Sequence, residues 1–140
     1  MVDYRGYKFF IDTYNASPSS LASAARTFGG IEIPEGGRRI ALVADMLEQG
    51  EEHQQIHFDS GVMLAESCVD CTFAYGDDAK YLVEGIRSKG GEAYYFADRD
   101  TFNRTIAAVV RPGDAILVKG SHAMQLYEET VVPVFGDVVG

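Results

Sequence analysis

The chain has 140 residues, of which 46% are apolar and 24% are charged, proportions typical of a folded protein rather than a disordered one. Its 21 acidic residues outnumber 12 basic residues and give a net charge of −9, which argues against nucleic acid as a partner, since binding a phosphate backbone requires clustered Lys and Arg. No stretch approaches the roughly 20 apolar residues that span a bilayer, and the first ten residues lack the pattern of a signal peptide. We therefore expect a single cytoplasmic domain over residues 1–140 with no membrane partner.

The first predicted strand and the first predicted helix flank a short polar segment. Phe9–Ile11 form an apolar run of strand length, and a helix is expected over Pro18–Phe28, because proline suits the first helical turn. Asn15 or Ser17 can cap this helix. These assignments leave Asp12, directly after the strand, without a structural role.

Strands and helices then alternate to the carboxyl end. A loop rich in Gly and Pro precedes Arg39–Ala44, a continuous apolar run that indicates a strand buried on both faces. The following elements are expected at 53–66 (helix), 71–74 (strand), within 77–91 (helix), 92–98 (strand), 99–110 (helix) and 111–121 (strand), and at about 124–131 (helix). This order predicts an α/β fold: a Rossmann-like doubly wound, mostly parallel sheet of about five or six strands with helices on both faces.

Polar residues follow three of the predicted strands. Residues 12–15 follow the first strand, residues 45–48 follow the strand at 39–44, and residues 119–122 follow the last strand. Ligands of doubly wound sheets bind outside the carboxyl ends of the strands. We therefore expect these three loops to share one edge of the sheet.

The loop "VKGSHAM" ends a strand in Lys119 and leads into a predicted helix. The lysine, the hydroxyl of Ser121 and the unpaired N–H groups of a helix start can together receive an anion. The alternative is a surface lysine beside a helix cap. The P-loop motif G-x-x-x-x-G-K-[ST] does not occur in the sequence, so a triphosphate would need another means of binding.

The acidic loop "DMLEQGEEH" offers Asp45 and Glu48 as ligands for a cation or an ammonium group, although carboxylates also favour the start of the next helix. His53 and His57 have the i, i+4 spacing of metal ligands but lack the Glu of H-E-x-x-H and a third ligand nearby. We therefore expect no metal site here.

Two cysteines, Cys68 and Cys71, form a single C-x-x-C. A redox pair normally lies where a strand leads into a helix, whereas this pair lies where a helix leads into a strand. With no second C-x-x-C to complete a zinc site, we interpret both residues as small apolar side chains of the kind that are commonly buried.

Three segments, "DTYNASP", "VADMLEQGEEH" and "GDAILVKGSHAM", in this order and at these separations, resemble the carboxyl-terminal domain of the Mur ligases. The form D-x-Y-N-A-x-P followed by D-M-L-E-x-G is similar to the branch of the family that joins D-alanyl-D-alanine to UDP-N-acetylmuramoyl-tripeptide. The resemblance covers nearly the whole chain. It implies the third domain of a longer enzyme, with the amino-terminal and central ATPase domains lying outside these residues.

The resemblance implies a ligase of peptidoglycan precursor synthesis. ATP phosphorylates the carboxylate of UDP-N-acetylmuramoyl-tripeptide, and the amino group of D-alanyl-D-alanine then attacks the acyl phosphate. In the family ATP and Mg²⁺ are bound mainly by the central domain, so the isolated chain is expected to hold no cofactor and to be inactive. Closure of the third domain would keep water away from the acyl phosphate.

The resemblance also implies roles for individual residues. Asp12 is expected to bind the nucleotide through the ATP ribose, near the hinge to the central domain. His122 stands where many relatives have the arginine of K-G-S-R, so a bidentate contact of that arginine with a carboxylate would become at most one hydrogen bond here. The residues expected to bind the dipeptide or phosphate are Asn15, Ser17, Lys119 and Ser121, with Asp45 and Glu48 as further candidates for the ammonium group.

Two other functions are compatible with the sequence. One is a free-standing binding module for a small anionic peptide or nucleotide, and the other is a related amide ligase with a different amino substrate. A P-loop domain immediately upstream of these residues would favour a ligase over the binding module.

Overall fold

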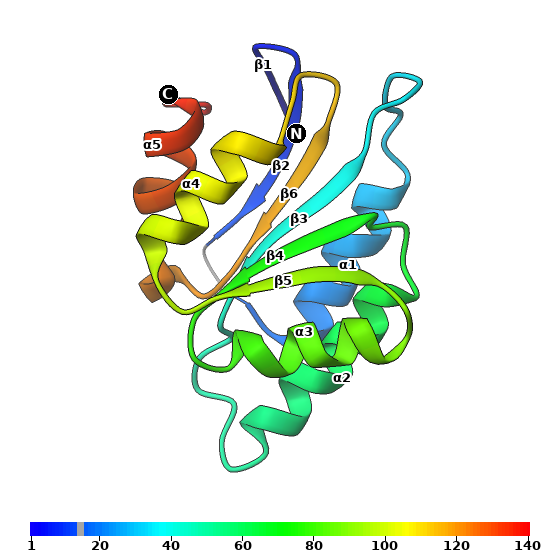
Figure 1. The fold of residues 1–140 in the computed structure, drawn as a ribbon, viewed down its shortest axis with the longest axis vertical. Coiled ribbons are helices and arrows are strands. Elements are labelled where there is room, and N and C mark those ends of the chain that lie inside the picture. The colour runs from blue at the N-terminus through cyan, green and yellow to red at the C-terminus, as the bar shows by residue number, and fades with distance from the viewer. Residues whose placement is uncertain (14–15) are drawn as a thin grey trace.

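Figure 1 shows the computed structural model, which describes residues 1–13 and 16–140. In the described residues a twisted sheet has the strand order β1-β2-β6-β3-β4-β5, and all neighbouring strands are parallel except β1 and β2. The strands are β1 (Val2–Tyr4), β2 (Tyr7–Asp12), β3 (Arg39–Ala44), β4 (Cys71–Tyr75), β5 (Glu92–Phe96) and β6 (Ala115–Lys119). The predicted α/β fold with a mostly parallel sheet is therefore confirmed.

Helices cover both faces of the sheet (Figure 1). One face carries α1 (Pro18–Gly29), α2 (His53–Ala65) and α3 (Ala79–Ser88), and the other carries α4 (Arg99–Val109) with η1 (His122–Met124), η2 (Tyr127–Val131) and α5 (Val132–Phe135). Among the described residues no helix combines the length and the apolar character needed to cross a bilayer.

Strand β3 lies in the middle of the core, as its uninterrupted apolar sequence predicts. Ala41 and Val43 face the layer of α1, α2 and α3, whereas Ile40 and Leu42 face the layer of α4, because successive side chains of a strand point to opposite faces. All four are at most 2% exposed. Burial on both faces holds the carboxyl end of β3 in a rigid position.

The start of α1 is set by Ser17 and Pro18, as predicted. The Ser17 hydroxyl accepts a hydrogen bond from the Ser20 N–H, and the Ser20 hydroxyl accepts one from the Ser17 N–H, which together form a capping box. The other predicted cap, Asn15, lies outside the described residues.

The carboxyl-terminal helix differs from its predicted bounds of about 124–131. A 3₁₀ turn ends at Met124, Gln125 is left-handed with φ 50°, and the π-helical segment η2 then leads into α5. The guanidinium of Arg99 donates to the carbonyl oxygens of Met124 (2.6 Å) and Gln125 (3.3 Å), which supplies partners for the groups that the break leaves unpaired. A contact from α4 therefore stabilises the break in the expected helix.

The short strand β1 is a further element that the sequence analysis did not separate from β2. Arg5 and Gly6, with φ 49° and 88°, form a tight turn that folds Val2–Tyr4 back onto β2 as an antiparallel edge strand. Positive φ at two consecutive turn residues is the geometry that suits a two-residue hairpin.

Candidate functional site

The described parts of the three polar loops, which leave out residues 14 and 15, meet at one edge of the sheet, as predicted. Strands β2, β6 and β3 are neighbours, and their registers place Lys119 beside both Asp12 and Val43. From β3 the chain runs outward through β4 and β5 and returns on the opposite side of β3 as β6. The carboxyl ends of β6 and β3 therefore form a topological switch point, where doubly wound sheets bind ligands.

The first feature of this edge is a pair of opposite charges. The Nζ atom of Lys119 lies 2.7 Å from Oδ2 of Asp12 across two adjacent parallel strands. The lysine side chain is 1% exposed, whereas the aspartate side chain is 42% exposed. The interpretation of Lys119 as a surface lysine is therefore wrong: its ammonium is buried and paired, and the carboxylate of Asp12 reaches solvent.

Asp45 follows β3 and turns its carboxylate toward the start of α3. Its two oxygens each accept a backbone N–H at 2.8 Å, one from Asp77 and one from Ala79, and the residue is 5% exposed. Gly76, with φ +134°, makes room for this carboxylate, because a Cβ there would lie 2.3 Å from Oδ1. Asp45 thus satisfies N–H groups at the start of α3, where a negative charge is favourable.

Ser121 joins the loop after β6 to the loop after β3. Its Oγ accepts the N–H of Leu47 at 2.9 Å, and its own N–H donates to the carbonyl oxygen of Asp45 at 3.4 Å. Gly120 permits this approach, since a Cβ there would lie 3.0 Å from the Cβ of Ala44. The two loops therefore form one continuous surface.

Glu48 lies beyond these bonds, exposed and with φ +61°. A non-glycine residue is uncommon in this left-handed region and is found there when its surroundings hold it. Ser17 is half-buried, and its hydroxyl serves as the helix cap. His122 is exposed at the first position of η1.

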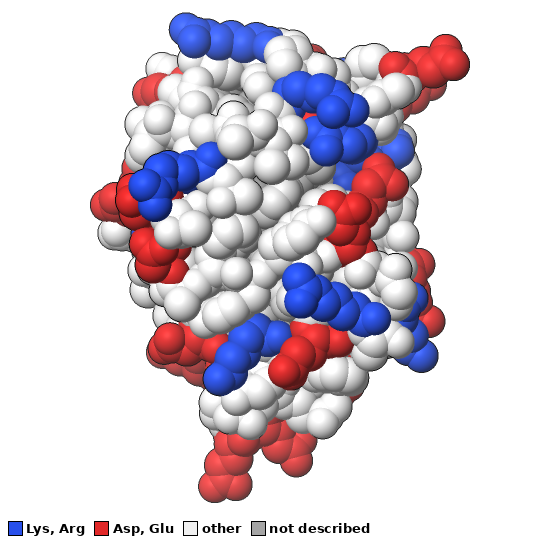
Figure 2. Space-filling view, in the orientation of Figure 1, with Lys and Arg blue, Asp and Glu red and all other residues white. Residues whose placement is uncertain are grey.

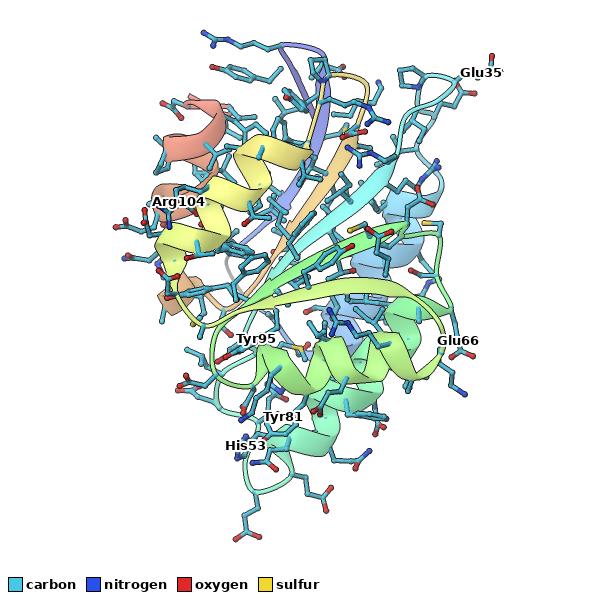
Figure 3. The ribbon with its side chains drawn as sticks, in the orientation of Figure 1. Glu35, His53, Glu66, Tyr81, Tyr95 and Arg104 are labelled. Carbon is cyan, nitrogen blue, oxygen red and sulfur yellow. The ribbon has the colours of Figure 1, made fainter. Side chains whose placement is uncertain are left out.

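The sequence analysis missed the main role of His57. Its buried ring binds the backbone of Met46 through Nε2 and the carbonyl oxygen of His53 through Nδ1, so neither nitrogen is offered to a metal. His53, labelled in Figure 3 at the start of α2, pairs instead with Asp78 at 2.7 Å. Among the described residues no group of three or more His, Cys, Asp and Glu side chains could hold a metal ion.

The two cysteines are both free. Cys71 is buried at the start of β4, and burial raises the pKa of its thiol to about 12. Cys68 is exposed, so the expectation of a buried apolar residue is confirmed for Cys71 and is wrong for Cys68.

Two of the hollows in the surface lie away from the three loops. One of about 400 Å³ lies between α1 and the end of α2, and one of about 420 Å³ lies against β5, where Tyr94 and Phe96 line it. Figure 2 shows an uncharged band over β5, between the positions of α4 and α3 in Figure 1. The predicted site lies elsewhere, at the edge of the sheet where β2, β3 and β6 end.

Comparison with known proteins gives evidence about the family of this chain that is independent of the geometry. The family model described as "Mur ligase, glutamate ligase domain" matches residues 1–122. The chain is 30% identical over 127 residues to the UDP-N-acetylmuramoyl-tripeptide--D-alanyl-D-alanine ligase of Bacillus subtilis, covering 88% of this chain and 27% of that protein. It is 28% identical over 120 residues to the protein of the same name from Treponema pallidum, covering 84% and 26%. It thus spans about a quarter of the length of these relatives.

Solved structures share the fold. A crystal structure of MurF from Acinetobacter baumannii superposes with a TM-score of 0.81 at 25% identity, covering 96% of this chain and 28% of that one. The MurF ligase of Thermotoga maritima in complex with ADP gives a TM-score of 0.72 at 23% identity, covering 97% and 30%.

Proposed function

Because the chain belongs to the Mur ligase glutamate ligase domain family, we propose that it is the carboxyl-terminal domain of a cytoplasmic UDP-N-acetylmuramoyl-tripeptide:D-alanyl-D-alanine ligase. The proposed reaction is phosphorylation of the tripeptide carboxylate by ATP, followed by attack of the dipeptide amino group on the acyl phosphate. The four curated relatives named for this activity, each covered over only about a quarter of its length, support this assignment.

The observation that carries the proposal is the convergence of three polar loops at the switch point of the sheet. We assign Asp12 to the ATP ribose, since its carboxylate is 42% exposed and can accept a hydroxyl donor as in dinucleotide-binding folds. Lys119 holds that carboxylate in place and contributes positive charge at the same edge. The groups assigned to the dipeptide are Asn15, Ser17, Glu48 and Ser121, and Asp45 supports their loop through α3.

Mg²⁺ and the phosphates of ATP are assigned to a central domain outside this chain. The sequence has no P-loop, and the described residues provide no acidic cluster of the kind that Mg²⁺ requires. The part of this domain in the reaction is then to position the amine and to exclude water when it closes over the acyl phosphate.

The proposal is tested on the full-length protein that contains these residues. We expect it to form the extended UDP-N-acetylmuramoyl-peptide, with stoichiometric release of phosphate, when ATP, the tripeptide substrate and D-alanyl-D-alanine are supplied together. A panel of single amino acids and other dipeptides serves as the control for the amino substrate. Faster turnover with one of those amines would assign the protein to another amide ligase, and absence of any ATP-dependent product would refute a ligase function.

A further inference from the structure

His57 is a fully buried histidine whose ring lies against the loop after β3. Its Nε2 accepts the N–H of Met46 at 3.0 Å, and its Nδ1 lies 2.6 Å from the carbonyl oxygen of His53. Accepting at Nε2 and donating at Nδ1 requires the neutral ring with its proton on Nδ1. Every hydrogen-bonding atom of the ring is thereby engaged with backbone groups.

Three consecutive residues of this loop are each held by a different element. Asp45 is held by the N–H groups at the start of α3, Met46 by His57 of α2, and Leu47 by the Ser121 hydroxyl after β6. The left-handed Glu48 follows immediately and is exposed. An unfavourable backbone conformation persists only where its surroundings hold it, and the bonds of these three residues immediately precede Glu48.

We infer that His57 is a positioning residue for the dipeptide site. Its ring fixes the backbone of Met46 and so determines how the loop presents Glu48, two residues further along. This inference rests on the proposed function for its consequence in catalysis, although the hydrogen bond itself can be tested without any activity. His53, four residues earlier on α2, pairs its side chain with Asp78, whose Oδ2 lies 3.9 Å from Nδ1 of His57, and provides a control for the loss of a histidine from this helix.

The first test uses the unmodified chain. Nitrogen-15 NMR of the imidazole rings should show His57 as the Nδ1–H tautomer, with a coupling across the hydrogen bond between its Nε2 and the amide of Met46. A proton on Nε2 would overturn the inference, because a protonated Nε2 cannot accept that amide.

The second test compares amide exchange in three variants. His57→Phe keeps a ring but removes the acceptor, so we expect the Met46 and Leu47 amides to exchange at least about tenfold faster than in the unmodified chain. His57→Gln keeps an acceptor oxygen at a similar reach and should restore most of the protection. His53→Ala should leave both amides within about threefold of their original rates. Unchanged exchange in His57→Phe would show that the loop does not depend on the ring.

The third test measures kinetics of the full-length ligase. His57→Phe should raise the KM for D-alanyl-D-alanine at least about tenfold while the KM for ATP changes less than about threefold, and His57→Gln should recover most of the loss. Equal effects on both substrates would contradict a positioning role at the dipeptide site.

If the unmodified enzyme does not use the dipeptide, the proposed function fails while the exchange experiment still decides the role of the ring. If His57→Phe does not fold, the role of the ring is decided by amide exchange in His57→Gln and by the tautomer of His57 in the unmodified chain.

Discussion

Lys119 and Asp12 form an ion pair of 2.7 Å between two residues that are 107 positions apart in the sequence. The pair is asymmetric, since the ammonium is buried and the carboxylate is partly exposed. A buried ammonium is costly unless it is paired, so the carboxylate of Asp12 stabilises the buried lysine, while the exposed side of Asp12 stays accessible. One carboxylate can therefore serve both the fold and the proposed nucleotide site.

Removing the lysine should weaken both stability and catalysis. Lys119→Met preserves side-chain volume and should lower the free energy of unfolding by about 1 kcal/mol, because it removes the charged hydrogen bond while the carboxylate of Asp12 stays accessible to water. In the full-length ligase the same change should reduce kcat/KM about a hundredfold or more. Lys119→Arg should rescue poorly, because a planar guanidinium does not fit the buried space of an ammonium.

Urea unfolding and a double-mutant cycle with Asp12→Asn provide the check on this pair. The double variant should lose less stability than the sum of the losses of the two single variants, because each single variant already removes the interaction between the two side chains. Additive losses would show that the two side chains do not stabilise each other, and unchanged kinetics in Lys119→Met would remove the lysine from the functional site.

Asp45 should be important for stability through its bonds to α3. Asp45→Asn replaces one accepting oxygen by an NH₂ group that faces a backbone N–H, so we expect a loss of about 2–3 kcal/mol in the free energy of unfolding. The matched control is Asp59→Asn, because Asp59 is exposed and accepts a side-chain hydrogen bond from Gln55 on the same helix. That control should change stability by less than about 0.5 kcal/mol. If thermal unfolding shows equal losses of stability for the two changes, the role of Asp45 in holding the start of α3 is contradicted.

The two cysteines should differ sharply in reactivity. Burial raises the pKa of the Cys71 thiol to about 12, so it stays protonated at pH 8, and raising the pH toward that pKa is needed before its thiolate becomes populated. Cys68 is exposed. Iodoacetamide at pH 8 should therefore label Cys68 alone, as read by peptide mass spectrometry, and should label both after unfolding in urea. Equal labelling of the folded chain would show that Cys71 is accessible.

The isolated chain should bind its ligands weakly and should not turn over ATP. Asp12 can contact a ribose, but a phosphate-binding loop is missing from the sequence, so most of the binding free energy for ATP has to come from another domain. Isothermal calorimetry should give dissociation constants above about 100 μM for ATP and for D-alanyl-D-alanine. The binding free energy is then less favourable than roughly −5.5 kcal/mol. Micromolar binding of either ligand would mean that its site is complete here and would favour a free-standing binding module.

The sequence by itself determined the architecture. The apolar runs such as Arg39–Ala44, the helix signal at Ser17 and Pro18, and the alternation of strands with helices are local patterns, and the structure reproduces them. The parallel order also placed the three polar loops at one edge, because the carboxyl ends of parallel strands point the same way. Prediction failed where a distant residue intervened, as where Arg99 binds the carbonyl groups at Met124 and Gln125.

Only the tertiary structure decided what each polar side chain of the site contacts. Lys119 faces Asp12 rather than solvent, Asp45 faces the start of α3, and His57 faces the backbone of Met46. Each contact joins residues from different elements, 107, 34 and 11 positions apart. Spacing along the chain identifies residues that can bind a charge or a proton. The partner of a buried polar group depends instead on how strands and helices pack, because packing brings the two groups together.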